Sequence, residues 1–292
     1  MAHATFRTSH LTAVVGDNEG SGSHKPGYNG VWSLRHTGCP RDLFTRESGG
    51  LNHEHIFDGE TDDTRPEIFY EPRHAPMEFL KLSDQEGELH QPPTPTFHLE
   101  SWTRFTFLDP DIIDISYRCI PHPPVFDRGF LGLFWASYIH APEDKSMYFR
   151  GGLEGEKPVW TQICTPWHND RSTVRSRLDR MDLTFRSENR PSLFRSLSRL
   201  RFDLPLFYGR FEDHVWIVMF DRSEGIRLTH SPSGGGYDAA RETTNPAWDF
   251  QFLVPEPQLL QPYEFRARAI FRPWRCREEI LDLHRDWEAG LS

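Results

Sequence analysis

The chain has 292 residues, of which 37% are hydrophobic, and a formal net charge of −10. This length suits one large all-β domain or two ordinary domains, and the composition provides enough apolar residues for a core. The negative charge and the lack of a long basic run exclude a typical nucleic-acid-binding surface, which needs clustered positive charge. No run of 18 apolar residues exists, so the sequence predicts no membrane-spanning helix.

The N-terminal region has a composition of its own. Residues 16–30 are rich in glycine and serine, so we expect residues 1–29 to form a loose lead-in. The first thirty residues contain no apolar segment of the kind found in a signal peptide, and we therefore expect a cytoplasmic protein. A structural zinc cluster or a disulfide framework is not indicated, because no Cys-x-x-Cys pair occurs among the four cysteines Cys39, Cys119, Cys164 and Cys276.

Strand-like segments dominate the rest of the chain. Residues 96–109 and 111–120 alternate apolar and polar side chains, which is typical of strands with one buried face. The Asp109-Pro110 pair between them predicts a turn. Residues 130–140 are apolar at nearly every position, so we expect a strand that is buried on both faces.

The C-terminal half contains further strands and the few helical patterns. Residues 214–220 and 263–273 are expected to be strands, and residues 190–200 could form a short amphipathic helix. Residues 276–291 predict the clearest helix, because apolar residues recur there at helical spacing. The whole pattern predicts an all-β fold over 1–292: a single large antiparallel β-sandwich with a C-terminal helix.

The motif His53-Glu54-His55 is the most distinctive feature of the sequence. In a regular strand, residues i and i+2 point to the same face, so we expect both imidazoles to point into a pocket, with Glu54 turned away. Three interpretations remain open: sugar recognition with acid/base chemistry, metal binding, or an ordinary polar strand edge. A metal site would need a third ligand, for which the candidates are Glu60, Glu78, His122 and His140.

Further polar and aromatic residues are candidates for contact with a substrate. Arg73 follows the histidine pair closely and could clamp a carboxylate or vicinal hydroxyls. Residues 229–250 are expected to form a long glycine-containing loop, which is either functional or a solvated insertion. Including residues at predicted turns and strand ends, the candidate substrate-binding residues are Arg73, His74, Glu78, His122, Tyr138, Tyr208, Arg210, His230 and Trp248.

Three stretches resemble the galactose mutarotase-like family, which includes the aldose 1-epimerases. The first runs from FHLESWTRFTFLDPDIIDISYRCI into GFLGLFWASYIHAPEDKSMYFRGG, where Tyr138 and His140 resemble a histidine-bearing segment of mutarotases. The second, NPAWDFQFLVP, has Asp249 and Gln251 near where mutarotases carry an acidic residue close to a glutamine. The third, PYEFRARAIFRP, is similar to the strand that ends such domains. The resemblance covers about residues 30–275, although the usual Asn-Arg pair is absent and the acid is aspartate rather than glutamate.

The resemblance implies a super-sandwich with a concave sugar-binding face and an enzyme that transfers protons at a sugar. The reaction would be epimerisation, ring opening, or an isomerase or lyase step. In the mutarotase version, His140 would protonate the ring oxygen and Asp249 would take the proton from the anomeric hydroxyl. His53, His55 and Arg73 would position the sugar.

The expected geometry is that His53, His55 and His140 converge on one concave face, with Arg73 or Tyr208 nearby. The expected partner is a small sugar or oligosaccharide, with neither nucleic acid nor membrane involved. Two other classes stay open. One is a metal-dependent sugar isomerase or lyase in which His53 and His55 hold a divalent metal, and the other is a carbohydrate-binding protein without catalysis. The sequence indicates no oligomeric state, and the enzyme has either no cofactor or a divalent metal.

Overall fold

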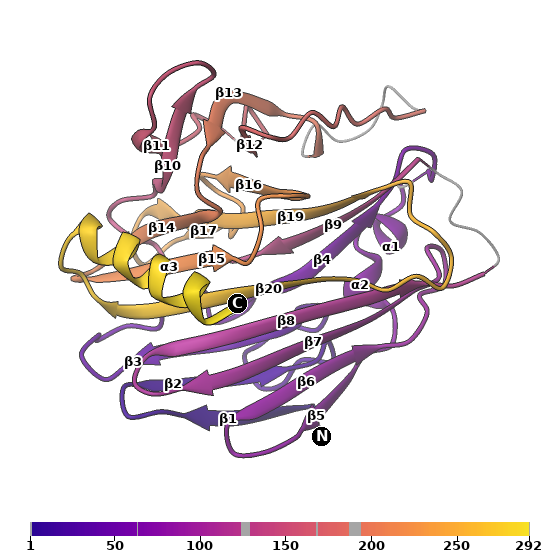
Figure 1. The fold of residues 1–292 in the computed structure, drawn as a ribbon. Coiled ribbons are helices and arrows are strands. Elements are labelled where there is room, and N and C mark those ends of the chain that lie inside the picture. The colour runs from indigo at the N-terminus through magenta and orange to yellow at the C-terminus, as the bar shows by residue number, and fades with distance from the viewer. Residues whose placement is uncertain (1, 63, 124–128, 168, 187–193, 292) are drawn as a thin grey trace.

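The computed structural model describes residues 2–62, 64–123, 129–167, 169–186 and 194–291. In this part of the chain, one mixed sheet of fifteen strands forms the body of the molecule (Figure 1). The strand β11 (Val159–Ile163) pairs only with β10. The other strands follow one another across the sheet in the order β4 (Asn52–Phe57), β9 (Phe130–Ala136), β19 (Ala247–Pro255), β16 (Ile226–Ser231), β12 (Thr173–Ser176), β13 (Leu197–Phe202), β10 (Met147–Leu153), β14 (Leu206–Phe211), β15 (His214–Phe220), β20 (Tyr263–Pro273), β8 (Ile112–Pro121), β7 (Leu99–Leu108), β6 (Glu86–Gln91) and β5 (Glu78–Lys81).

A second sheet has three antiparallel strands, β1 (His3–Arg7), β2 (Leu11–Gly16) and β3 (Gly30–His36). One face of this sheet belongs to the same hydrophobic core as the large sheet, and Phe6 stacks on Phe107 with ring centroids 4.8 Å apart. The all-β sandwich predicted from the sequence is therefore confirmed. Among the described strand pairs of the large sheet, only β12 and β13 run parallel.

The expectation of a loose lead-in over residues 1–29 is wrong, because β1 and β2 lie in this range. Their apolar side chains alternate with polar ones, as strands with one buried face require. The core receives Phe6, Leu11, Ala13 and Val15. The glycine and serine residues that suggested a lead-in follow β2, in the connection to β3.

The long strands expected from alternation are present. The pair β7 and β8 flanks a turn at Asp109-Pro110, as predicted. Every residue of β9 and of β15 is buried, as predicted for strands whose two faces are both covered. The predicted loop over 229–250 is instead the end of β16, the short hairpin of β17 (Tyr237–Asp238) and β18 (Thr243–Thr244), and the start of β19.

The predicted C-terminal helix is confirmed as α3 (Arg277–Leu291). It lies across β15 and β20 (Figure 1), where Ile280 and Trp287 pack into a cluster with strand residues that include Ile217 and Ile270. The helix expected over 190–200 is wrong for its described end, because β13 starts at Leu197. Residues 190–193 lie outside the described residues.

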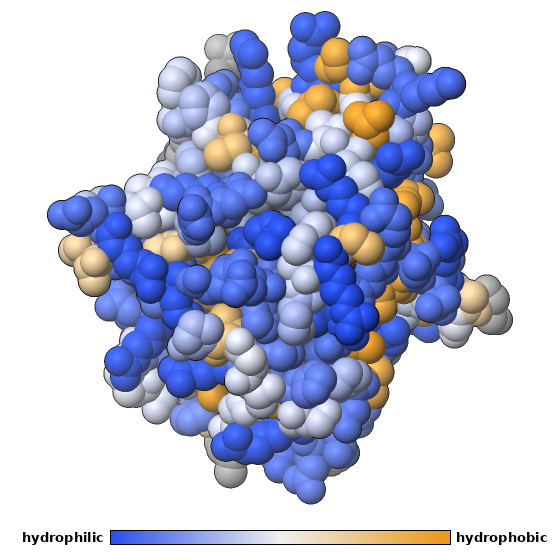
Figure 2. Space-filling model, turned by 90° about the vertical axis from the view of Figure 1, so that its left-hand side faces the viewer, coloured by the Kyte–Doolittle hydropathy of each residue, from blue (hydrophilic) through white to orange (hydrophobic). Residues whose placement is uncertain are grey.

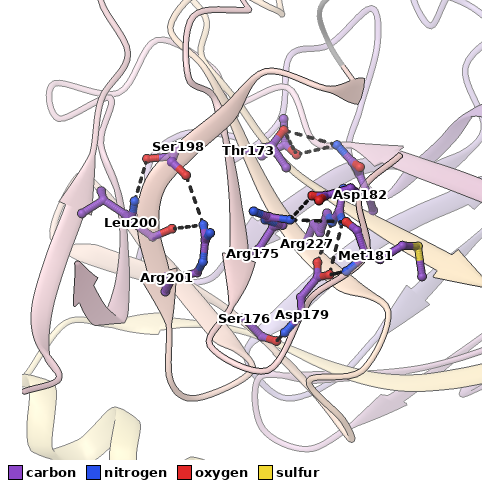
Figure 3. A network of polar contacts seen from close by, with 12 residues as sticks. Thr173, Arg175, Ser176, Asp179, Met181, Asp182, Ser198, Leu200, Arg201 and Arg227 are labelled. Atoms are coloured by element: carbon purple, nitrogen blue, oxygen red, sulfur yellow. Dashed lines mark hydrogen bonds and ion pairs between the residues drawn. The ribbon is translucent and has the colours of Figure 1, made fainter. Parts of the chain in front are cut away.

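A buried ion pair joins β16 to the chain that follows β12 (Figure 3). Arg227 is fully buried and donates from Nε to Oδ2 of Asp179 at 2.7 Å and from Nη2 to the carbonyl of Met181 at 2.6 Å. Arg175 on β12 donates to Oδ1 of Asp182 at 3.0 Å. These contacts fix β12 and β16, and β16 pairs with β19.

The surface on the left-hand side of Figure 1 is covered mainly by hydrophilic side chains (Figure 2). The mean hydropathy of −0.64 agrees with this view. Within the described residues, no helix has both the length and the apolar character needed to cross a membrane.

Candidate functional site

A β-bulge decides where the side chains of the His53-Glu54-His55 motif point. On β4, His53 pairs with Trp135 of β9, whereas His55 pairs with the neighbouring residue Phe134, so the register shifts at Glu54. Such a bulge places two residues opposite one and breaks the alternation of faces. His53 therefore lies on the face of Trp135, and His55 lies on the opposite face with Phe134. The expectation that both imidazoles share a pocket while Glu54 turns away is wrong.

His53 is a core residue. Its ring stacks on Trp135 with centroids 4.9 Å apart and meets Tyr117 edge-on at 5.7 Å. The residue is 2% exposed, and burial, followed by the neighbouring His55, lowers the pKa of His53 to about 3. It is therefore a neutral imidazole inside the sandwich and does not line the cavity described next.

The opposite face of β4 opens onto a cavity of about 290 Å³. Two short helices that follow β4 in the sequence, α1 (Pro66–Phe69) and α2 (Glu71–His74), lie beside β4 in Figure 1. The cavity is lined by acidic, aromatic and small side chains from β4, α1, the end of β9, β19 and two loops, namely Glu54, His55, Phe69, Tyr70, Phe134, Tyr138, Asn169, Gly234, Ala247 and Asp249.

Glu54 is held by two donors. The Tyr138 hydroxyl lies 2.7 Å from each carboxylate oxygen, and Nη1 of Arg73 donates to Oε1 at 3.0 Å. Arg73 is itself fixed, because its guanidinium lies over the rings of Tyr28 and Tyr70, at 3.8 and 4.7 Å from their centroids. Burial, and then the charge of Glu54, raise the pKa of Tyr138 well above its usual value, so the hydroxyl keeps its proton and donates a hydrogen bond to Glu54.

Asp249 enters the cavity from β19. It is 4% exposed, and its Oδ1 accepts the backbone N–H of Ser137 at 2.9 Å. Burial raises the pKa of Asp249 well above its usual value, the Ser137 hydrogen bond opposes this shift, and the charge of Glu54 adds to it. This shift favours the protonated carboxyl group, which is the form in which a carboxylic acid donates a proton in enzymes.

His55 has an aromatic environment. Its ring lies 4.3 Å from Phe69, 4.9 Å from Tyr70 and 5.3 Å from Phe134. Its Nδ1 lies 2.6 Å from the carbonyl oxygen of Phe69, so Nδ1 carries the proton and Nε2 is left as an acceptor. Burial lowers the pKa of His55, which Glu54 partly opposes. The residue is a neutral imidazole that can accept a proton through Nε2.

The structure brings four of the predicted site residues to this cavity: His55, Tyr138 and Asp249 line it, and Arg73 supports Glu54. His140 lines a different cavity of about 580 Å³ and lies 3.2 Å from Oδ2 of Asp238. The expected convergence of His53, His55 and His140 is therefore wrong.

The remaining predicted residues lie elsewhere. His230 and Trp248 are fully buried and both contact the carbonyl of Lys145, at 2.9 and 3.0 Å. Tyr208 accepts a hydrogen bond from Arg277 of α3 at 2.8 Å. Of the others, Arg210 lies over the Trp274 ring, His122 pairs with Glu100, and the exposed residues are His74 and Glu78.

Sequence reasoning missed Glu54 as a cavity residue, along with Phe69, Tyr70 and Asn169. Glu54 is part of the His53-Glu54-His55 motif, but the pattern of apolar and polar residues along a strand does not reveal a β-bulge. The run Phe69-Tyr70 next to Arg73 is a usable signal, because aromatic faces beside an arginine often stabilise its charge.

A divalent metal was one expectation for the histidine pair. His53 and His55 face opposite sides of β4, and the only metal-type cluster among the described residues contains neither of them. The two imidazoles therefore do not lie together as ligands of one ion.

Comparison with known proteins shows the fold. No family model matches the sequence, and no curated protein matches it either. The structure is similar to an Escherichia coli K12 protein provisionally named aldose 1-epimerase, with a TM-score of 0.54, 9% identity, and coverage of 93% of this chain and 99% of that one. It is also similar to a GalM/aldose epimerase homologue from C. elegans, with a TM-score of 0.50, 8% identity, and coverage of 94% and 100%.

A third similar structure belongs to a longer protein. It is a mutant of the heparan sulfate lyase HepC from Pedobacter heparinus, with a TM-score of 0.51, 9% identity and coverage of 94% of this chain. Only 36% of the lyase is covered, so this chain corresponds to about a third of that protein. At such low identity these similarities establish the fold, which is galactose mutarotase-like, and nothing finer.

Proposed function

We propose that this chain is a cytoplasmic enzyme that transfers protons on a small sugar bound in the cavity of Glu54, His55 and Asp249. The observation that carries the proposal is that one cavity holds the buried carboxyl group of Asp249, whose pKa is raised, and the imidazole of His55, whose pKa is lowered. The first shift favours a proton donor and the second favours a proton acceptor, as general acid–base catalysis requires.

The proposed reaction is interconversion of sugar anomers by ring opening. Nε2 of His55 takes the proton from the anomeric hydroxyl, the bond between the anomeric carbon and the ring oxygen breaks, and Asp249 gives its proton to the ring oxygen. The product is the open-chain aldehyde, and closure from the other face with both protons returned gives the other anomer. This assignment differs from the expectation based on His140 and makes Asp249 the acid rather than the base.

Glu54 has a supporting role in this scheme. Its negative charge favours the protonated form of His55, which exists only while the ring is open. Tyr138 and Arg73 fix the position of the carboxylate, so the charge is already oriented before the proton moves. Neither oxygen of Glu54 needs to exchange a proton with the sugar.

The cavity supports a small substrate. Its volume of about 290 Å³ lies just below the range of about 300–1,000 Å³ that is usual for small-molecule sites. The lining combines aromatic rings with a few polar groups, which is the usual composition of such sites. We therefore favour one sugar ring over an oligosaccharide.

The test is a panel of aldohexoses and aldopentoses, each dissolved as a single anomer and followed by polarimetry with and without the protein. We expect faster anomerisation of at least one sugar, and loss of that acceleration in Asp249→Asn. The matched control is His140→Ala, which changes a histidine outside the cavity. Sugar binding by calorimetry without any acceleration would contradict an enzyme and favour the carbohydrate-binding alternative.

A further inference from the structure

Three potential metal ligands meet where the small sheet contacts the large one, and none of them lines the cavity of Asp249. His10 lies in the turn between β1 and β2, His36 ends β3, and Asp111 lies in the turn between β7 and β8. Backbone hydrogen bonds hold these turns together, since the His10 N–H donates to the Pro110 carbonyl at 3.1 Å. One ligand atom from each residue lies within 4.8 Å of the other two.

Two buried atoms of this cluster have no hydrogen-bond partner in the described part of the chain. One is Nε2 of His36, and the other is Oδ1 of Asp111, although the two residues are only 5% and 2% exposed. A buried polar atom without a partner is costly and calls for a physical explanation. Oδ2 of Asp111 is already used, because it accepts from Nε of Arg272 at 3.1 Å.

His10 completes the cluster from the solvent side. Its side chain is 47% exposed, and its Nδ1 lies 3.8 Å from Oδ2 of Asp111. Tetrahedral zinc with nitrogen ligands at about 2.0–2.1 Å sets ligand atoms about 3.3 Å apart. The cluster must therefore contract, and the exposed His10 side chain is free to move for this purpose.

We propose that His10, His36 and Asp111 bind one divalent transition-metal ion of the Zn²⁺ type, with water in the fourth position. Two imidazoles and a carboxylate form a ligand set that suits such an ion. The bound ion would clamp the β1–β2 turn and the end of β3 to the β7–β8 turn, and thus the small sheet to the large one. Its role is structural, because no cavity of the proposed enzyme adjoins it.

The surroundings of His36 fit a ligating histidine. Its Nδ1 lies 3.0 Å from Nε2 of His214. When Nε2 of His36 binds the metal, the ring proton resides on Nδ1 and is donated to His214, an outer partner of the kind that metal-bound histidines have. This tautomer gives up the contact from the Gly38 N–H at 2.9 Å.

The positive charge of Arg272 lies next to the cluster. Arg272 is the cation in contact with Asp111, and it also donates to Glu279 of α3 at 3.2 Å. Its charge is therefore shared between two carboxylates, and Asp111 keeps Oδ1 for the ion. This arrangement resembles the outer-shell contacts that orient ligating carboxylates.

The experiment is titration of the metal-free protein with Zn²⁺ by calorimetry and with Co²⁺ by visible absorption. We expect one equivalent to bind, a cobalt spectrum of nitrogen and oxygen ligands, and a rise in melting temperature. His10→Ala should weaken binding by about 100-fold or more and abolish the rise in melting temperature. This variant removes an exposed side chain and should fold normally, and the exposed histidine of His74→Ala serves as the matched control.

The proposal is overturned if His10→Ala binds both metals as tightly as the wild type. It is also overturned if the wild type binds neither metal at micromolar concentration. A sulfur charge-transfer band in the cobalt spectrum would assign binding to the exposed Cys164 or Cys276 instead. These readouts do not involve sugar turnover, so they are independent of the proposed enzymatic activity.

Discussion

The two histidines of β4 have the same residue type and nearly the same place in the chain, but they have different environments. His53 is enclosed by Trp135 and Tyr117 in the sandwich core, whereas His55 lines a cavity with Asp249. One inserted residue in the pairing of β4 with β9 produces this difference. The comparison teaches that a His-x-His pair becomes a shared site only when its strand is regular.

The largest expected effect comes from Asp249→Asn, which removes the proposed proton donor but keeps an oxygen for the Ser137 N–H. We expect the turnover number for the responsive sugar to fall by about 10²–10⁴-fold, which is the usual contribution of a general acid. Polarimetry gives the rate, and circular dichroism checks the fold. Wild-type turnover in this variant would exclude Asp249 as the acid.

His55→Gln tests the histidine that lines the cavity. The glutamine amide can still donate to the Phe69 carbonyl, but it cannot accept a proton. We expect turnover to fall by about 100-fold or more, with a small change in melting temperature. Equal losses of turnover and of thermal stability would point to a structural role for this ring.

His53→Phe tests the histidine that is buried in the core. We expect a change in the pH dependence of the unfolding free energy, while turnover persists. Burial lowers the pKa of His53 to about 3, whereas an unfolded histidine titrates near 6.5. Between these values the unfolded chain binds the proton and the folded chain does not. The wild type therefore loses about 1.4 kcal/mol of unfolding free energy per pH unit as pH falls, and the variant lacks this contribution.

Urea unfolding of both proteins at pH 7 and pH 5 measures this difference. The other buried histidines are common to both proteins, so their contributions cancel. The stability of His53→Phe relative to the wild type should improve at the lower pH. Parallel pH dependences would mean that His53 is not a buried neutral imidazole, and a loss of sugar turnover with an intact fold would place it in the site.

The smallest effect is expected for His140→Ala. His140 lies outside the cavity, and its pair with Asp238 is partly exposed. We expect turnover within about twofold of the wild type and an unfolding free energy lowered by no more than about 1 kcal/mol. A hundredfold loss of turnover would restore the role that the family resemblance implies for this residue, as the group that protonates the ring oxygen.

Much of the fold was predictable because the apolar residues that become buried recur in the sequence at the spacing of strands or of a helix. The alternation over residues 111–120 and the apolar run of 214–220 correspond to β8 and β15. The helical spacing near the C-terminus corresponds to α3. The prediction of a loose lead-in was wrong because the glycine- and serine-rich composition after β2 drew attention away from two short strands. The prediction of a helix over 190–200 was wrong at its described end because strand pairing in the tertiary structure outweighs a weak helical preference.

The site was only partly predictable. Tyr138 was found because it lies at the end of a strongly patterned strand, and Asp249 because its segment resembles one that carries an acidic residue in mutarotases. Glu54 was misplaced because a strand-period argument assumes regular pairing, and the strand with which β4 pairs, β9, lies about eighty residues away in the sequence. The short helices that bring Arg73 to Glu54 depend on packing against β4 rather than on their own sequence.

The central claim is that a protonated Asp249 acts beside Glu54 in one cavity, and carboxyl NMR of protein labelled with ¹³C at the aspartate side chain tests it directly. At pH 7 we expect one resonance at the position of a protonated acid, absent in Asp249→Asn and shifted when the responsive sugar binds. An Asp249 resonance that titrates near its ordinary value of about 4, with no response to sugar, would contradict the account.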